Sequence, residues 1–177
     1  FETPTGRQTL AELFQGRSRL LVYHFMLGPG WAAGCPGCSF LSDHLDGALP
    51  HLEHHDVTLI AVSRAPLAEI QAYQTRMGWR FPWVSAFGSD FNYDCHASPD
   101  EAVAPVAYNY RDQAEMLARG ETGNLTGELP GISVFLRDGE QVFHSYSSYA
   151  RGLDTLLTTY HYLDLTPFGR GEGWGGM

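Results

Sequence analysis

Apolar residues in the first half of the chain form two kinds of pattern, continuous runs and stripes at helical spacing. Residues 20–25 (LLVYHF) and 57–62 (VTLIAV) are short runs that are almost wholly apolar, which is typical of strands buried on both faces. Between these runs, apolar residues recur at helical spacing from residue 39 to residue 49. This stripe predicts a helix that stops near Pro50.

The same two patterns continue toward the C-terminus. Ala65-Pro66 opens a predicted helix that ends near Gly78, because proline suits the first position of a helix and glycine suits its end. Later, Asp138-Gly139 forms a two-residue turn between apolar runs, which predicts a β-hairpin. The remaining predicted elements are a strand at 81–85, the hairpin strands at 131–137 and 141–146, and a closing helix at 149–163.

Residues 89–128 differ from the rest because they are polar, contain glycines and show weak periodicity, with partial helix expected only at 101–108 and 113–118. We interpret them as an insertion within a single domain of residues 1–177, and residues 168–177 as a flexible Gly-rich tail. Strand, helix, strand, helix, strand followed by a hairpin predicts an α/β fold, with a central mixed sheet flanked by helices and the insertion just before the strand that follows Pro130.

Charge and composition exclude two classes of partner. The net charge of −9 and the pI near 5.2 do not suit a nucleic-acid surface, which needs clustered Lys and Arg. No stretch approaches the ~20 apolar residues of a membrane span, and no signal peptide is visible at the start. Three cysteines are too few for a disulfide scaffold, so a cytoplasmic location is expected.

The strongest chemical signal is the motif Cys35-Pro36-Gly37-Cys38, which lies between a predicted buried strand and a predicted helix. Backbone N–H groups at a helix start stabilise a thiolate, so Cys35 is the expected nucleophile. Cys38, one turn later, is expected to resolve the mixed disulfide. This arrangement is typical of thioredoxin-like oxidoreductases, whose substrates are thiols or disulfides of proteins or small molecules.

Three further residues are candidates for the same site. Pro130 precedes a strand expected beside the cysteine pair, where thioredoxin folds hold a cis-proline that receives an extended substrate. Trp31, in the loop before Cys35, either shields the thiolate and binds substrate or packs under the loop. His24 is a candidate proton relay, with a hydrogen-bonded core histidine as the alternative.

Other reactive residues stand apart from the motif. Cys95 brings a third thiol, next to His96, and its alternative role is that of a small buried hydrophobe. Arg64 and Arg151 are candidates for contacting an anionic ligand, with exposed surface charge as the alternative.

Metal binding is the first alternative function. The spacing Cys35-x2-Cys38-x12-His51-x3-His55 fits a zinc finger, but Pro50 interrupts the helix that would carry the histidines, so no zinc site is expected.

Copper is the stronger metal candidate, because copper chaperones of the Sco type use two cysteines and a distant histidine on a thioredoxin fold. Here His144 or His96 would be the third ligand, although the cysteine spacing is one residue shorter than in those chaperones. The second alternative is a redox-silent binding module that uses the groove near Pro130. The leading hypothesis needs no cofactor, and the oligomeric state stays open.

Long strings of the chain also resemble a known family. YHFMLGPGWAAGCPGCSF, DVTLIAVSRAPL, MGWRFPWVSAFGSDFNYD and ELPGISVFLRDG are similar to a bacterial family of thioredoxin-like proteins of unknown function, over residues 10 to about 170. The resemblance implies the thioredoxin fold and a bacterial, cytoplasmic protein. Residues 77–85 more distantly resemble peroxiredoxins, whose motif places Thr or Ser three residues before the reactive Cys; Ala32 stands there, so their peroxidase chemistry is not expected.

Overall fold

The computed structural model describes residues 1–171, and its centre is a seven-stranded sheet in the order β2-β1-β5-β4-β3-β8-β9. The strands of this sheet are β1 (Glu2–Thr3), β2 (Gly6–Arg7), β3 (Arg19–His24), β4 (Val57–Ser63), β5 (Trp83–Ser85), β8 (Gly131–Asp138) and β9 (Gln141–Tyr149). Strands β3, β4 and β5 are parallel, whereas β8 is antiparallel to β3 and β9. The predicted α/β fold with a central mixed sheet is therefore confirmed.

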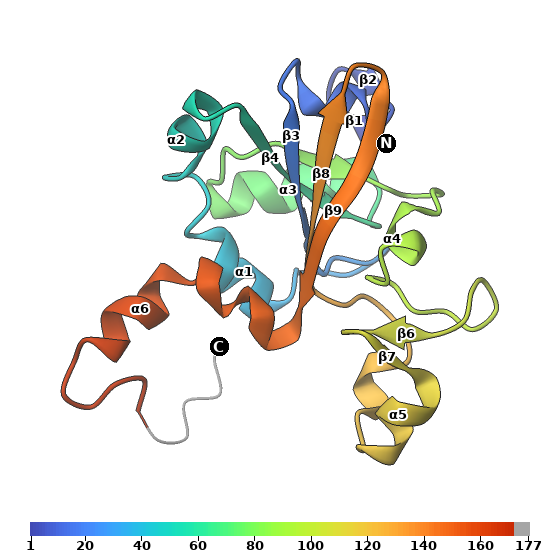
Figure 1. Ribbon diagram of the computed structural model, residues 1–177, viewed down its shortest axis with the longest axis vertical. Helices are drawn as coiled ribbons and strands as arrows, with labels where there is room; N and C mark the ends of the chain where they lie inside the picture. Colours follow the sequence, from blue (N-terminus) through green and yellow to red (C-terminus); the bar gives the residue numbers. More distant parts are fainter. Residues whose placement is uncertain (172–177) are drawn as a thin grey trace.

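Helices cover both faces of this sheet (Figure 1). The α-helices are α1 (Pro36–Ser42), α2 (Leu49–His54), α3 (Leu67–Met77), α4 (Phe91–Asp94), α5 (Gln113–Ala118) and α6 (Thr158–Asp164), and the 3-10 helices are η1 (Glu12–Phe14), η2 (Thr122–Asn124) and η3 (Ala150–Leu156). None of the helices within residues 1–171 has the length and apolar composition of a membrane span.

Alternate residues of β3 point into two separate cores, because successive strand side chains face opposite sides. Tyr23 packs with Cys38 of α1 and Ile70 of α3 on one face. Val22 packs with Phe14 of η1 on the other face, which is also where Phe91 of α4 lies. In Figure 1, α1 accordingly lies on one side of β8 and β9, and α4 on the other. The chemistry of the two faces must therefore be considered separately.

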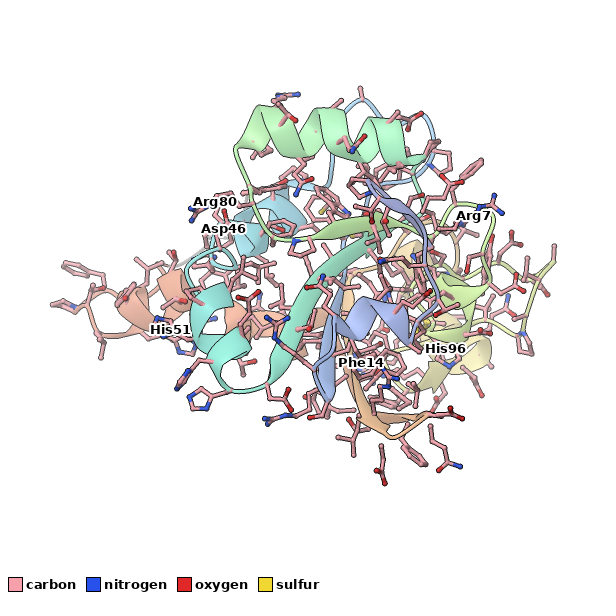
Figure 2. All side chains as sticks on the ribbon, turned by 90° about the horizontal axis from the view of Figure 1, so that it is seen from above. Arg7, Phe14, Asp46, His51, Arg80 and His96 are labelled. Carbon is pink, nitrogen blue, oxygen red and sulfur yellow. The ribbon has the colours of Figure 1, made fainter. Side chains whose placement is uncertain are left out.

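Two predicted helices are interrupted. The helix expected over residues 39–49 ends at Ser42, and Pro50 lies in the first turn of α2, where its missing N–H costs nothing. Between these helices, the Asp46 carboxylate accepts the backbone N–H groups of Arg80 (3.0 Å) and Phe81 (2.8 Å), and Figure 2 shows Asp46 beside Arg80. This contact with a distant segment replaces the helix predicted from local periodicity.

The closing helix is also divided, because Leu157, at φ −95° and ψ 80°, separates η3 from α6. The strand expected at 81–85 is shorter than predicted and begins at Trp83. The predicted helix is confirmed as Leu67–Met77 with its stop at Gly78, at φ 76°, although Pro66 is its N-cap rather than its first helical residue. The N-terminal strands β1 and β2 have no strong apolar pattern and were not predicted.

The insertion folds beside the sheet as a small hairpin and a helix. Strands β6 (Ala107–Tyr108) and β7 (Arg111–Asp112) form a separate two-stranded sheet, which in Figure 1 lies on the same side of β9 as α4. Helix α5 confirms the prediction at 113–118, and Asp112 and Glu115 form its capping box. No helix forms over residues 101–108, where that prediction is wrong.

Part of the predicted flexible tail is anchored. The guanidinium of Arg170 binds Asp164 (2.8 Å) and Asp154 (3.1 Å). Residues 172–177, where the rest of the predicted tail falls, lie outside the described residues.

Candidate functional site

The chain delivers Cys35 to the N-terminal end of α1 through a tight loop. A Cβ at Gly34 would lie 2.4 Å from a ring carbon of Phe25, so only glycine allows this approach of the loop to the core. The Cys35 N–H donates to Met26 O (3.1 Å), and the Cys35 carbonyl accepts the N–H of Ser39 (2.9 Å). Cys35 is therefore the N-cap residue of α1, with Pro36 in the first turn.

The environment of Cys35 favours a thiolate. Its side chain is half-buried, and the thiol of Cys38 donates a hydrogen bond to its sulfur, which lowers the pKa of Cys35 to about 6. The backbone N–H groups of Cys38 and Gly37 lower this pKa further, whereas burial acts against them. A pKa near 6 leaves most of the Cys35 population ionised at neutral pH.

Cys38 has the opposite character. It is buried, and its donated hydrogen bond to Cys35, together with burial, raises its pKa well above the ordinary value. Two groups act against this rise: the phenol of Tyr23 donates to the Cys38 sulfur, and the Met26 N–H lies 3.5 Å from it. The pair thus consists of an accessible thiolate above a buried, protonated thiol.

Beside the cysteine pair lies a cavity of about 230 Å³. Its wall is mainly apolar and comes from α1, η3 and α6, including Phe40, Leu153 and Tyr160. Cys35, Cys38 and Pro130 also line it. The cavity therefore gives a small molecule access to the Cys35 sulfur.

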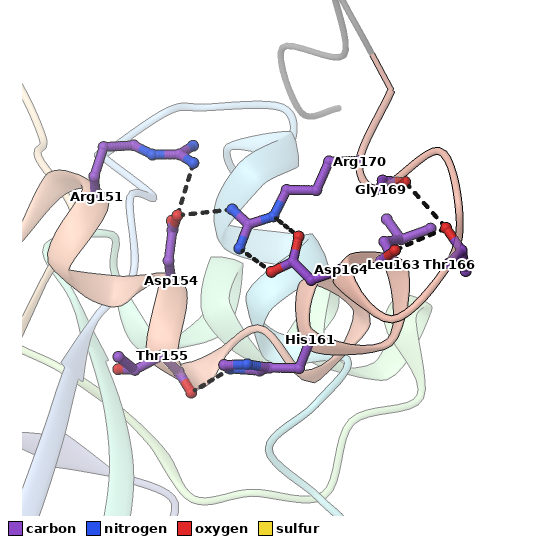
Figure 3. A network of polar contacts seen from close by, with 9 residues as sticks. All are labelled: Arg151, Asp154, Thr155, His161, Leu163, Asp164, Thr166, Gly169 and Arg170. Atoms are coloured by element: carbon purple, nitrogen blue, oxygen red, sulfur yellow. Dashed lines mark hydrogen bonds and ion pairs between the residues drawn. The ribbon is translucent and has the colours of Figure 1, made fainter.

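A charged network holds the outer wall of this cavity (Figure 3). Asp154 binds Arg151 (2.7 Å) and Arg170 (3.1 Å), and Arg170 continues to Asp164. Arg151, which lines the cavity, keeps 74% of its side chain exposed. Of the two arginines predicted to contact an anion, Arg151 is therefore the one at the cysteine cavity.

Pro130 lies beside the cysteine pair as predicted, but the peptide bond before it is trans. The prediction of a cis-proline was therefore wrong. The trans form is the more stable for any X–Pro bond by about 0.5–1 kcal/mol. Here the Tyr108 hydroxyl also holds the Pro130 carbonyl at 2.8 Å.

Trp31 and Arg64 do not line the cysteine cavity. Trp31 is 41% exposed and lines a different hollow, between its loop and Tyr73 of α3. This placement speaks against substrate binding at Cys35, and the exposed ring does not pack under the loop either. Arg64 pairs with the buried Glu128 (3.3 Å) and lies over the ring of Tyr93 at 4.7 Å.

His24 lies on the other face of the sheet from the cysteine pair. Its Nε2 is 2.9 Å from the hydroxyl of Ser133, its ring stacks on Phe91, and burial lowers its pKa to about 3. This placement supports the core-histidine alternative and corrects the proton-relay prediction. The neighbour Tyr23 contacts Cys38 instead. The sequence does contain a signal for this difference. Successive side chains of a strand point to opposite faces of the sheet, so residues 23 and 24 cannot both face the cysteine pair.

The histidines considered as copper ligands lie on that other face too. His144 and His96 line a second cavity, together with Cys95 and apart from the residues around Cys35. Within residues 1–171, no group of three or more His, Cys, Asp or Glu side chains is arranged to hold a metal ion. The third ligand that the copper alternative required is therefore not at the cysteine pair.

Comparisons with solved structures show the fold. The bacterioferritin comigratory protein of Xanthomonas campestris, studied for its alkyl peroxide reduction activity, matches with a TM-score of 0.55 at 14% identity, over 89% of this chain and 87% of that chain. Thioredoxin peroxidase I of Plasmodium yoelii matches with a TM-score of 0.53 at 15% identity, over 90% of this chain and 79% of that chain. These likenesses establish a thioredoxin-like fold.

Sequence comparisons give the family. No curated protein shows a significant match. The family model described as "Bacterial protein of unknown function (DUF899)" matches residues 1–176. The chain therefore belongs to the DUF899 family of bacterial proteins.

Proposed function

We propose that this protein is a thiol-disulfide oxidoreductase in which Cys35 is the nucleophile and Cys38 the resolving thiol. The observation that carries the proposal is the contrast between the two sulfurs. Cys35 lines a cavity and has a pKa lowered to about 6, whereas Cys38 lies beneath it, buried and protonated. A thiolate that is accessible at neutral pH is the form that attacks a disulfide.

The reaction proceeds in two exchanges. The Cys35 thiolate attacks one sulfur of the substrate disulfide, a bond forms between them, the substrate S–S bond breaks, and one substrate thiolate leaves. Cys38 then loses its proton and attacks the Cys35 sulfur, which releases the second substrate thiol and leaves a Cys35–Cys38 disulfide. Two electrons pass from the cysteine pair to the substrate, and a dithiol donor restores the pair. The reverse sequence oxidises a substrate dithiol.

Tyr23 assists the second exchange. Cys38 must become a thiolate to attack, and burial opposes that charge. The Tyr23 hydroxyl and the Met26 N–H both donate to its sulfur, so they stabilise the anion as it forms. Tyr23 is thus a positioning residue that acts through Cys38.

A small neutral disulfide tests the proposal. We expect 2,2′-dithiodipyridine to release two equivalents of thiopyridone from the fully reduced Cys95→Ser protein, because both Cys35 and Cys38 are consumed. Cys35→Ser in this background is expected to abolish the fast phase, and Cys38→Ser to stop the reaction at one equivalent. If Cys35→Ser reacts as fast as its parent, the thiolate assignment is wrong, and the redox-silent binding module becomes the better account.

A further inference from the structure

Outside the cysteine pair, a cavity of about 440 Å³ lies on the opposite face of the sheet. Ligand cavities commonly measure about 300–1,000 Å³. Its floor includes Phe135 of β8 and His144 and Tyr149 of β9, and its roof comes from the insertion, through Tyr108 and Tyr110. Residues of the insertion therefore line this second cavity and not the cavity beside the cysteine pair.

Aromatic rings dominate the wall. Phe91, Phe135 and three tyrosines line the cavity. The hydroxyl groups of these tyrosines are turned to backbone acceptors: Tyr108 donates to Pro130 O (2.8 Å), Tyr110 to Ser147 O (2.6 Å) and Tyr149 to Cys95 O (2.9 Å). The tyrosines therefore supply ring surface to an occupant and keep their hydroxyls for fixing the wall.

A few polar groups at the wall remain available. His144 uses Nε2 for contacts with Ser147 Oγ (2.7 Å) and Tyr146 O (3.0 Å), and its Nδ1 makes no hydrogen bond within residues 1–171. The side chains of His96 and Asp94 also line the cavity, and neither makes a hydrogen bond or ion pair with any other residue that the structure describes. A carboxylate and the unprotonated nitrogen of an imidazole ring accept hydrogen bonds, so they suit a ligand that donates one.

The roof is held at a conformational cost. Asn109 and Tyr110 both have positive φ, at 51° and 60°, in the two-residue turn between β6 and β7. Such turns favour Asn-Gly, and a bulky residue with positive φ is unfavourable. Tyrosine in place of glycine costs turn stability, while its ring lies 5.7 Å from that of Tyr149 and lines the edge of the cavity, with 76% of the residue exposed.

We infer that this cavity is a second ligand site, which binds a neutral aromatic molecule of one or two rings that carries a hydroxyl group. The five rings of the wall pack against the aromatic part, and Asp94, His96 or His144 accepts the hydroxyl proton. An anionic aromatic binds more weakly, because Asp94 lines the wall and the chain carries a net charge of −9. The inference does not depend on redox activity of Cys35.

The probe is 2-naphthol, with 2-naphthoate as its anionic counterpart. We expect saturable binding of 2-naphthol to the full chain by equilibrium dialysis, and at least about tenfold weaker binding of 2-naphthoate. Ala107→Phe places a benzyl group in the cavity and is expected to weaken 2-naphthol binding by about tenfold or more. Ala118→Phe makes the same change at an exposed position of α5 and serves as the matched control.

A second pair of variants and a labelling experiment test the same inference if Ala107→Phe does not fold. Tyr110→Ala removes part of the roof and should weaken binding, whereas Tyr110→Phe keeps the ring and should retain it. In the Cys35→Ser/Cys38→Ser protein, Cys95 is the only thiol, and bound 2-naphthol should slow its reaction with methyl methanethiosulfonate. Binding that is absent, insensitive to Ala107→Phe and Tyr110→Ala, or lost in Cys35→Ser overturns the inference.

Discussion

The hydrogen bond from Cys38 to Cys35 can be tested by removing its donor. Cys38→Ala deletes the largest contribution that lowers the pKa of Cys35, which stands at about 6. A hydrogen bond to a charged partner contributes about 1.5–3 kcal/mol, or about 1–2 pKa units. Because Cys35 is only half-buried, solvent screens part of this energy, and we expect the lower end of the range. The pKa of Cys35 should therefore rise from about 6 to about 7.

The readout must be the midpoint of the pH titration. At pH 6.5 the ionised fraction of Cys35 should fall from about three quarters to about one quarter. A thiolate of higher pKa is also intrinsically more nucleophilic, so a single rate would partly conceal the change. The assay is the rate of iodoacetamide alkylation of Cys35 between pH 5 and pH 9, followed by mass spectrometry in a Cys95→Ser background.

Cys38→Ser is the matched control, because its hydroxyl still donates to the Cys35 sulfur and should keep the midpoint near that of the parent. An unchanged midpoint in Cys38→Ala refutes the reasoning and assigns the stabilisation to the backbone N–H groups of Gly37 and Cys38. A parent midpoint near 8.5, the free-cysteine value, removes the working thiolate altogether.

Three further predictions concern groups around the site. Tyr23→Phe removes a donor to Cys38 and should slow closure of the Cys35–Cys38 disulfide about tenfold, with the first attack unchanged. Stopped-flow release of the two thiopyridone equivalents separates the two steps. Equal slowing of both steps would contradict the role assigned to Tyr23. Arg151→Gln should lower the rate with the anionic 5,5′-dithiobis(2-nitrobenzoate) a few-fold at low salt and leave neutral 2,2′-dithiodipyridine unaffected, because this guanidinium is largely exposed. A similar loss for both reagents would mean a structural effect. His24 stays neutral when folded, with a pKa of about 3, while the unfolded chain protonates it below about 6.5. Stability should therefore fall by about 2 kcal/mol between pH 6.5 and pH 5. Urea unfolding of His24→Gln should lack this part of the pH dependence, and an unchanged pH dependence would contradict the low pKa.

Local patterns predicted the centre of the fold. Residues 20–25 and 57–62 became adjacent strands, because continuous apolar runs have few stable alternatives to a sheet covered on both faces. The start and stop of α3 followed from Pro66 and Gly78, whose backbone preferences do not depend on distant residues. The position of Cys35 at the start of a helix followed from the same kind of local signal.

Contacts between distant segments determined what the sequence did not reveal. Asp46 interrupts the predicted helix because it binds backbone groups before β5, and no local pattern encodes that partner. The insertion is polar and short in its elements, so its placement over the second cavity depends on single contacts such as that of Tyr110 with Ser147. The trans bond at Pro130 is the form that X–Pro bonds prefer intrinsically, and the cis prediction came from the likeness to thioredoxin folds rather than from the residues themselves.

The insertion also contacts the backbone on which an extended substrate of the proposed reaction would bind. An extended peptide would bind beside Pro130 by pairing with free backbone groups, as a strand adds to a sheet edge. Here the Leu129 N–H already donates to Ala97 O (2.8 Å), the Pro130 carbonyl accepts the Tyr108 hydroxyl (2.8 Å), and Pro130 has no N–H. Residues of the insertion therefore occupy two of the three backbone groups at residues 129 and 130, and of these three only the Leu129 carbonyl accepts no hydrogen bond from residues 1–171.

Small disulfides should consequently be the better substrates of this protein. Loss of two backbone hydrogen bonds, each worth about 1 kcal/mol, corresponds to about 30-fold in rate for a peptide substrate. We expect reduced protein to react with 2,2′-dithiodipyridine through Cys35 but to accelerate insulin reduction little over dithiothreitol alone. Tyr108→Phe frees the Pro130 carbonyl and the Ala150 N–H but not the Leu129 N–H, so it should raise the insulin rate by no more than half of this effect on a logarithmic scale. Insulin reduction as fast as that of a general protein disulfide reductase would show that substrates do not need the backbone at 129–130, and the restriction would then be wrong.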